Sequence, residues 1–268
     1  MAVSVVRAWN ELDMDAVCAR AKVIAFDLDN TLARSKKPMS GDMAHRVSRL
    51  TSLIPLAIVT GGSFGLVRSQ VLDVLDDGAQ RSNMHIMPTS GTRCYRWDGG
   101  QWKCVYEHDL SERDRSEATR CLRRRAQELG MWVDKAWGPR IEDRGSQITF
   151  SALGQLAPVE LKEAWDPTNE KKNRLAQAVA ADLPHLAVRS GGSTSIDISE
   201  RGVDKAYAVR RLADILRIDI GQIVFVGDRM DPDGNDYPAA VAGTVPVRVS
   251  GPCDTLRVCD RFIARLSE

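Results

Sequence analysis

Short, continuous apolar runs alternate along the chain with segments of helical periodicity. Four runs have the composition of strands that are buried on both faces: residues 23–26, 56–59, 223–226 and, more weakly, 245–249. Amphipathic spacing predicts helices over residues 11–21, 40–52, 64–76 and 203–216. Because strand and helix alternate, we predict an α/β domain with a parallel sheet and helices on both of its faces.

The middle of the chain has a different pattern. Asp98-Gly99-Gly100 lies between apolar positions and predicts a β-hairpin over residues 94–106. A charged amphipathic helix is expected at 110–129, and two segments that alternate like strands, 131–153 and 187–198, flank a polar helical segment near 159–181. We therefore predict an α+β cap domain at 105–198, inserted into an α/β core formed by residues 1–104 and 199–268.

Two carboxylates follow the first buried run directly. Asp27 and Asp29 stand at positions i and i+2, so they lie on one side of an extended chain. Two like charges held so close need a cation or a shared proton. Mg²⁺ suits them, because it prefers oxygen ligands and keeps coordination positions for substrate phosphate. The alternative is an Asp-rich turn that only ends a strand.

Polar residues also follow the other predicted strands and helices. Thr60 and Gly61 end the second strand, where a hydroxyl and backbone N–H groups can hold phosphate oxygens. Lys205 begins a helix and can neutralise charge on a transferred phosphoryl group. Asp228 follows the third strand and can complete the metal site. Asn235 or Asp236 can orient Asp228 without binding the metal itself. The carboxyl ends of parallel strands meet at one edge of the sheet, so these groups are expected to converge there.

Two other interpretations of these segments are disfavoured. The acidic loop 228–236 lacks the alternate-ligand spacing, ending in a Glu, of a calcium-binding loop. The six cysteines form no CxxC pair, which argues against a zinc site or a disulfide framework.

Length and charge restrict the protein further. A chain of 268 residues exceeds the size of one ordinary core, which agrees with two domains. The 37 Lys and Arg residues are balanced by 36 Asp and Glu residues, which argues against nucleic acid as a partner. No apolar run is long enough for a signal peptide or a membrane span, so we expect a cytoplasmic protein without a membrane partner.

The order of these motifs resembles that of the haloacid dehalogenase superfamily, whose members have a Rossmann-like core. Within it, the chain is most similar to subclass IIB and to the eukaryotic-type phosphomannomutase family, and the similarity extends over nearly the whole chain. The segments that carry it are the DxDxT sequence at 27–31, the lysine motif at 190–205, the GD…GND loop at 227–236, the cap segments 142–144 and 148–154, and the tail at 252–255.

The resemblance implies a role for each core residue. Asp27 would attack phosphorus and become an aspartyl phosphate. Asp29 would protonate the leaving oxygen and then activate the incoming hydroxyl or water. Asp27, the backbone carbonyl of Asp29 and Asp228 would bind Mg²⁺. Thr60 and Lys205 would hold the phosphoryl group.

In the cap, the resemblance implies that Arg144, Ser195 and Asp197 hold the sugar phosphate. The chain departs from the family at Asn30, which replaces a glycine, and at Gln155 and Lys162, which stand where arginines are expected. A mutase must hold a phosphate at the far end of the sugar, and bidentate arginine contacts suit that task better than a neutral amide.

Two enzymatic functions therefore stay open. The favoured one is a Mg²⁺-dependent phosphatase that acts on a small phosphorylated metabolite, plausibly a sugar phosphate. The other is a phosphomannomutase or related hexose phosphomutase, in which a sugar hydroxyl replaces water as the phosphoryl acceptor. A non-catalytic protein that binds a phosphorylated metabolite is a minor alternative. A homodimer formed through the cap is also open.

Overall fold

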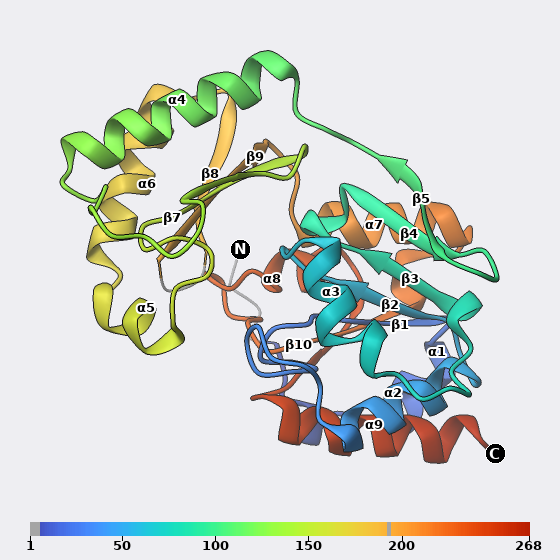
Figure 1. Ribbon diagram of the computed structural model, residues 1–268. Helices are drawn as coiled ribbons and strands as arrows, with labels where there is room; N and C mark the ends of the chain where they lie inside the picture. Colours follow the sequence, from blue (N-terminus) through green and yellow to red (C-terminus); the bar gives the residue numbers. More distant parts are fainter. Residues whose placement is uncertain (1–5, 192–193) are drawn as a thin grey trace. The chain divides into compact units, whose positions relative to one another are not determined.

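The computed structural model describes residues 6–191 and 194–268, and it divides the chain into two compact units (Figure 1). The core unit consists of Met1–Glu107 and Asp204–Glu268, and the cap unit is the inserted segment His108–Val203. The expected domain bounds at 105 and 198 lie inside β5 (Trp102–Glu107) and β9 (Ser195–Glu200). Each of these strands stays whole within one unit, because it pairs with a sheet of that unit.

The core contains one seven-stranded sheet in the order β11-β10-β1-β2-β3-β4-β5. The five strands from β11 to β3 pair in parallel, and β4 and β5 add an antiparallel edge. All four predicted strands are present, and β3 was missed. The strands are β1 (Val23–Phe26), β2 (Leu56–Val59), β3 (Met84–Met87), β4 (Arg93–Trp97), β5, β10 (Ile223–Gly227) and β11 (Val245–Arg248).

The predicted hairpin forms the antiparallel edge of this sheet. β4 and β5 are joined at Asp98, whose side chain accepts hydrogen bonds from the backbone N–H groups of Gly100 (3.0 Å) and Gln101 (2.8 Å). An aspartate that accepts from the following residues stabilises a tight turn. The hairpin therefore follows from local sequence.

Both faces of the sheet are covered by helices, as predicted. Ile24 and Phe26 of β1 pack into one apolar cluster, and Val23 and Ala25 pack into another on the opposite face. Successive strand side chains point to opposite faces, so a continuous apolar run serves both clusters. The first cluster includes residues of α1 (Met14–Arg20), α2 (Gly41–Thr51), α3 (Phe64–Gln70) and α9 (Pro252–Leu266), and the second includes residues of α7 (Lys205–Leu216) and α8 (Tyr237–Val241).

Side-chain caps mark where α1, α2 and α7 begin. Asp13 precedes α1 and accepts from the backbone N–H groups of the first turn, and Ser40 does the same for α2. Asp204 caps α7, which therefore begins at Lys205 rather than at the expected residue 203. The predicted helix at 64–76 is shorter, because α3 gives way to a 3₁₀ turn at Leu72–Val74. Further 3₁₀ turns lie at Trp9–Glu11, Arg81–Asn83, Thr89–Gly91 and Ile220–Gln222.

The cap has its own antiparallel sheet and its own core. Its strand order is β6-β7-β9-β8, and Ile148, Phe150, Ile196 and Ile198 form one apolar cluster with residues of two helices. The predicted helical segment near 159–181 is two helices, because the carboxylate of Asp166 ends the first and caps the second. The elements are α4 (Glu112–Glu128), β6 (Ile141–Asp143), β7 (Gln147–Ser151), α5 (Val159–Trp165), α6 (Glu170–Asp182), β8 (Leu186–Ser190) and β9.

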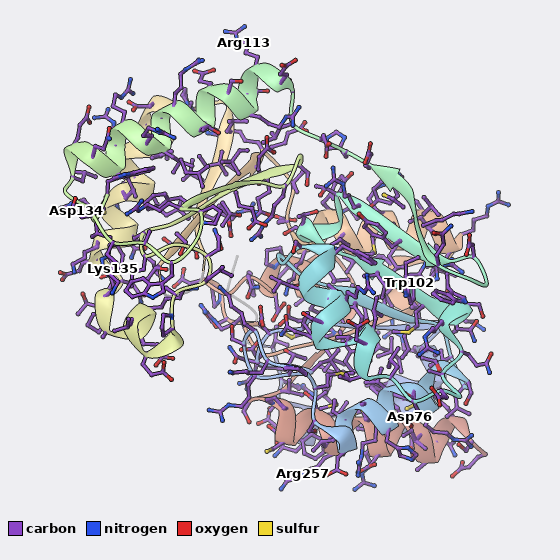
Figure 2. The ribbon with its side chains drawn as sticks, viewed as in Figure 1. Asp76, Trp102, Arg113, Asp134, Lys135 and Arg257 are labelled. Carbon is purple, nitrogen blue, oxygen red and sulfur yellow. The ribbon has the colours of Figure 1, made fainter. Side chains whose placement is uncertain are left out.

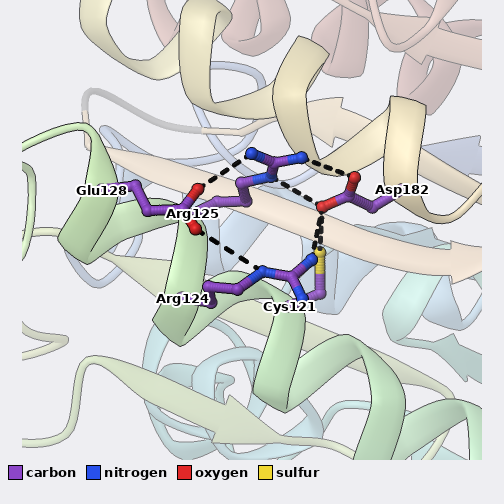
Figure 3. Close-up of polar contacts among 5 residues, drawn as sticks. All are labelled: Cys121, Arg124, Arg125, Glu128 and Asp182. Atoms are coloured by element: carbon purple, nitrogen blue, oxygen red, sulfur yellow. Dashed lines mark hydrogen bonds and ion pairs between the residues drawn. The ribbon is translucent and has the colours of Figure 1, made fainter.

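An ion-pair network joins α4 to α6 (Figure 3). Arg125 donates to both oxygens of Asp182 (2.6 and 2.7 Å), and Arg124 donates to one of them (2.8 Å). Glu128 accepts from Arg125, and Arg123 lies over the ring of Trp132. The hydrogen bonds from the two arginines lower the pKa of Asp182. The basic run of α4 is thus largely paired within the cap, whereas Arg113 at the start of the helix is exposed (Figure 2).

Within the described residues, no helix combines the length and the apolar character that crossing a bilayer requires.

Replacement of Asp182 by Asn should loosen the packing of α4 on α6. The pKa of Asp182 is lowered in the folded state, so its contribution is present above the unfolded value of about 4 and is lost as the pH falls below it. At pH 7, amide exchange in α4 and α6 should be about fivefold faster in Asp182→Asn than in the wild type. Hydrogen exchange followed by mass spectrometry measures this change.

The difference between the two proteins should shrink at pH 3. Asp134→Asn is the matched control, because this exposed carboxylate of the cap (Figure 2) makes none of the ion pairs found among the described residues. Equal exchange rates in the wild type and Asp182→Asn at pH 7 would show that the network does not stabilise the cap.

Candidate active site

Asp27 stands at the carboxyl end of β1, in the middle of the core sheet. Its backbone N–H donates to the carbonyl of Val226 in β10 (2.9 Å), so strand pairing continues up to the carboxylate. The residue is 3% exposed. The chain then turns at Asn30, which has a φ of 62°. Asparagine tolerates this left-handed conformation better than most residues do, which explains how it replaces the glycine expected there.

Three carboxylates meet at this edge of the sheet. Asp27, Asp228 and Asp236 each place an oxygen within 4.8 Å of the oxygens of the other two. The hydroxyl of Thr31 lies 3.2 Å from Oδ2 of Asp27 and 3.3 Å from Oδ1 of Asp228, so it links these two groups. A small group of carboxylate oxygens in a largely buried volume fits a hard divalent cation.

Among the residues that the structure describes, Lys205 supplies the positive charge that contacts this group directly. Its ammonium donates to Asp27 and to Asp236, and the side chain is 3% exposed. Burial opposes its charge, but the two aspartates raise the pKa of Lys205, so it stays protonated. One ammonium against three carboxylates leaves an excess of negative charge, which a divalent cation would neutralise.

Burial also governs the titration of Asp27. Burial raises the pKa of Asp27 to about 7; Lys205 opposes this shift, and Asp236 adds to it. The pKa of Asp228 is likewise raised, mainly by burial and by Asp236. A bound cation would favour the ionised form of both groups.

Thr60 occupies the end of β2, the strand next to β1. It is 2% exposed, and its hydroxyl accepts from the backbone N–H of Gly62 (3.1 Å). Its carbonyl accepts from the backbone N–H of Ser90 (2.8 Å). Apart from Gly61 and its two chain neighbours, no described residue has an atom within 4 Å of the place that a Cβ of Gly61 would take, so this side of the backbone is open. The segment can therefore admit phosphate oxygens.

Two predicted residues do not join the carboxylate group. The carboxylate of Asp29 accepts from the backbone N–H of Lys36 (2.9 Å) and from Gln70 (3.3 Å). Asn235 is exposed, and its side chain makes no hydrogen bond among residues 6–191 and 194–268. Asp236, its neighbour, is fully buried and accepts from the backbone N–H of Arg229 (3.0 Å). The roles expected of Asp29 and Asn235 stay predictions.

The three residues predicted in the cap lie on the polar face of its sheet. Ser195 and Asp197 stand two positions apart on β9 and share a face, and Ile196 between them points into the apolar cluster. Arg144 follows β6, and its guanidinium donates twice to Glu142 (2.7 and 3.0 Å). The side chain of Arg144 is 11% exposed. Their contact with a substrate stays a prediction.

Other polar residues of this face were not singled out from the sequence. The strand register puts Glu142, Thr149, Asp197 and Arg189 in one row across all four strands. Thr149 donates to Asp197 (2.7 Å), so it orients that carboxylate. The alternation of polar and apolar residues along β7 contains the signal for Thr149. In the core, Thr31 was likewise missed as a site residue, although it stands inside the first acidic motif.

The fold and the core site define the class of the protein. A largely parallel sheet between two helical layers, three carboxylates beside a buried lysine at the strand ends, and an inserted α+β cap are the features of the haloacid dehalogenase superfamily. The sequence profile described as "Eukaryotic phosphomannomutase" matches residues 43–265. The chain belongs to this family.

Individual relatives agree with the family assignment. The chain is 26% identical over 261 residues to a phosphomannomutase of Spinacia oleracea, a match that covers 94% of this chain and 100% of the relative. It is 24% identical over 262 residues to a probable phosphomannomutase of Caenorhabditis elegans, with the same coverage.

Solved structures with a similar fold include phosphatases. An N-terminally truncated IMP-nucleotidase of Plasmodium falciparum superimposes with a TM-score of 0.69 at 15% identity, over 93% of this chain and 72% of that one. A trehalose-6-phosphate phosphatase related protein superimposes with a TM-score of 0.56 at 17% identity, over 90% of this chain and 97% of that one. At these identities the similarity concerns the fold.

Magnesium should bind the core site about tenfold more tightly at pH 8 than at pH 6. A proton and the cation compete for Asp27, whose pKa is raised to about 7, so affinity rises with pH across this window. Isothermal titration calorimetry with Mg²⁺ at the two pH values measures the change. Asp27→Asn should bind more weakly and lose the pH dependence.

A cluster of acidic residues on the cap provides the control for this experiment. Asp114 and Glu117 lie near His185 and are partly exposed. Glu117→Gln should therefore leave magnesium affinity unchanged at both pH values. Equal affinity of the wild type at pH 6 and pH 8 would contradict the assignment of the site to the buried carboxylates.

Proposed function

We propose that the protein is a magnesium-dependent phosphatase that acts on a small phosphorylated metabolite of the sugar phosphate class. Membership of the phosphomannomutase family supports phosphoryl transfer as the chemistry. The observation that carries the proposal in the core is the buried Asp27, held by Lys205 beside a group of oxygens that fits a divalent cation. Magnesium, held by Asp27, Asp228 and the backbone carbonyl of Asp29, would neutralise charge on the phosphoryl oxygens.

In the first step, an oxygen of Asp27 attacks phosphorus. The P–O bond to the leaving group breaks, and Asp29 transfers its proton to the leaving oxygen. Lys205 and Thr31 contact different oxygens of Asp27, so the carboxylate is oriented before substrate binds. The hydroxyl of Thr60 and the backbone of Gly61 hold the phosphoryl oxygens.

In the second step, water attacks the phosphorus of the aspartyl phosphate. Asp29, now ionised, takes a proton from this water, and the bond between phosphorus and Asp27 breaks. Inorganic phosphate leaves, the Asp27 carboxylate is restored, and Asp29 is again protonated for the next turnover.

The choice of water as the acceptor is supported by Gln155 and Lys162 in the cap. The Lys162 ammonium donates to the backbone carbonyl of Gln155 (2.9 Å), and the residue is 7% exposed. The side-chain nitrogen of Gln155 is buried and has no hydrogen-bond partner among the described residues. A neutral amide and a buried ammonium replace two planar guanidinium groups here. They would hold a second phosphate less firmly than a mutase requires.

A sugar phosphate is supported as the substrate class by the polar face of the cap sheet. Ser195 and Asp197 offer a hydroxyl and a carboxylate of the kind that bind sugar hydroxyls, and the buried Thr149 orients Asp197. Arg144 adds a positive charge to the same face. The names of the relatives, which are phosphomannomutases, agree with this class.

A hexose phosphomutase is the second candidate function, and the family match over residues 43–265 favours it. It would use the same nucleophile, with a sugar hydroxyl in place of water. A non-catalytic binding protein is disfavoured, since such a protein needs neither the buried nucleophile nor a separate acid and base.

A phosphate-release assay with Mg²⁺ across a panel of sugar phosphates, including mannose 1- and 6-phosphate, tests the proposal. We expect release from one or a few members, and no isomerisation when hexose bisphosphate is added. Asp27→Asn should lower kcat by about a thousandfold or more, because the nucleophile is lost. Isomerisation with little release would assign the protein to the mutases. Activity of Asp27→Asn within about tenfold of the wild type would refute the nucleophile.

Arg144→Ala should weaken recognition of the sugar phosphate more than the chemistry in the core. We expect kcat/KM for the best sugar phosphate to fall about tenfold or more, and kcat/KM for p-nitrophenyl phosphate to change less than about twofold. The exposed Arg120 on α4 provides a control, and Arg120→Ala should change neither value. An equal loss with both substrates would rule out Arg144 as a specificity residue.

A further inference from the structure

Gln70 is a buried polar residue that the proposed mechanism does not yet use. It is the last residue of α3 and is 1% exposed. The helix begins directly after the Thr60–Gly62 segment and ends beside the loop that follows Asp29. The backbone carbonyl of Gln70 accepts from the backbone N–H of Met39 (2.9 Å), so this hydrogen bond attaches the end of the helix to that loop.

The side-chain amide of Gln70 contacts two acceptors. Its nitrogen donates to Oδ1 of Asp29 (3.3 Å) and to the backbone carbonyl of Lys37 (3.1 Å). A primary amide has two N–H groups, and both are used here. Because both neighbours can only accept at these atoms, they determine which end of the amide faces them. Rotation of the amide would break both hydrogen bonds.

This arrangement leaves the other end of the amide unsatisfied. The oxygen of Gln70 is buried and has no hydrogen-bond partner among the described residues. An unsatisfied buried acceptor destabilises a protein, and a methionine of similar size would avoid that cost. The glutamine is therefore poorly explained by apolar packing alone. Its hydrogen bonds to Asp29 and to the backbone carbonyl of Lys37 are the contacts that a methionine could not supply.

Asp29 is held at one oxygen only. Oδ1 accepts from Gln70 and from the backbone N–H of Lys36 (2.9 Å), whereas Oδ2 has no hydrogen-bond partner among the described residues. Two N–H donors occupy Oδ1, so a proton on this carboxyl group must reside on Oδ2. The contacts thus distinguish the two oxygens of the residue that is expected to exchange a proton.

We infer that Gln70 is a positioning residue for Asp29. It holds Oδ1 so that Oδ2 delivers the proton to the leaving oxygen as the bond between phosphorus and Asp27 forms. In the second step, the same Oδ2 accepts the proton of the attacking water. This inference rests on the proposed function, because it assigns Asp29 the work of acid and base.

The dependence on the leaving group tests the inference. Phenyl phosphate and p-nitrophenyl phosphate are similar in size, but p-nitrophenolate leaves without a proton more readily than phenolate does. Gln70→Met should lower kcat/KM for phenyl phosphate about tenfold or more and change that for p-nitrophenyl phosphate less than about twofold. kcat/KM is the appropriate quantity, because it reports the step in which the leaving group departs.

Three variants serve as controls. Ser69→Ala, next to Gln70 and exposed on α3, should behave as the wild type. Asp29→Asn should show the same stronger dependence on the leaving group. The double variant Gln70→Met with Asp29→Asn should lose no more than Asp29→Asn alone, because Gln70 acts through Asp29.

Several results would overturn the inference. An equal loss with both substrates would mean that Gln70 only supports the fold, and unchanged kinetics would mean that Asp29 needs no such contact. Failure of the wild type to release phosphate from either substrate would refute the proposed function instead.

Crystal structures of the wild type and Gln70→Met test the positioning role independently of activity. We expect the Asp29 carboxylate of the variant to leave the backbone N–H of Lys36. A carboxylate that keeps this position without Gln70 would refute the positioning role.

Discussion

The core site depends on the ammonium group of Lys205, which lies between the carboxylates of Asp27 and Asp236. Each of these charges is buried, and a buried charge destabilises a protein by several kcal/mol unless it is paired. The three residues come from the end of β1, the first position of α7 and the residue before α8. The parallel order of β1 and β10 and the N-cap at Asp204 bring them together. The pairing orients the Asp27 carboxylate, and the remaining negative charge would favour a cation at this site.

A second constraint links this lysine to the Thr60–Gly62 segment. Helix α7 packs so closely on the turn Thr89–Gly91 that a Cβ at Gly91 would lie 2.5 Å from the Cβ of Ala208. The same turn donates from the backbone of Ser90 to the carbonyl of Thr60. Gly91 has a φ of 80°, so a side chain there would be disfavoured by conformation as well as by space. The helix that presents Lys205 and the loop that presents Thr60 are therefore supported by one contact.

In the proposed function, the two units have separate tasks. The core contains every residue that the proposed chemistry requires, and the cap presents a polar sheet face on which Arg144, Ser195 and Asp197 lie together. Membership of the family supports phosphoryl transfer as the chemistry, but it does not identify the phosphoryl acceptor. The same nucleophile can serve a phosphatase, which uses water, and a mutase, which uses a sugar hydroxyl. The acceptor depends on how firmly a second phosphate is held. That question concerns Gln155 and Lys162 rather than the core.

The sequence by itself determined the elements whose signals are local. Continuous apolar runs identify β1, β2, β10 and β11, and Asp98-Gly99-Gly100 identifies the hairpin. The polar residues that follow those runs include Asp27, Thr60 and Asp228 of the core site. Tertiary structure decided what depends on distant partners. Met84–Met87 contains the polar His85. The segment is a buried strand because it pairs with β2 and β4, where Arg96 contacts the His85 ring. Asp236 rather than Asn235 turns inward, and Gln70 meets Asp29, because sheet order and helix packing set contacts between residues far apart in the chain. Periodicity is a property of neighbouring residues, and it contains no information about such contacts.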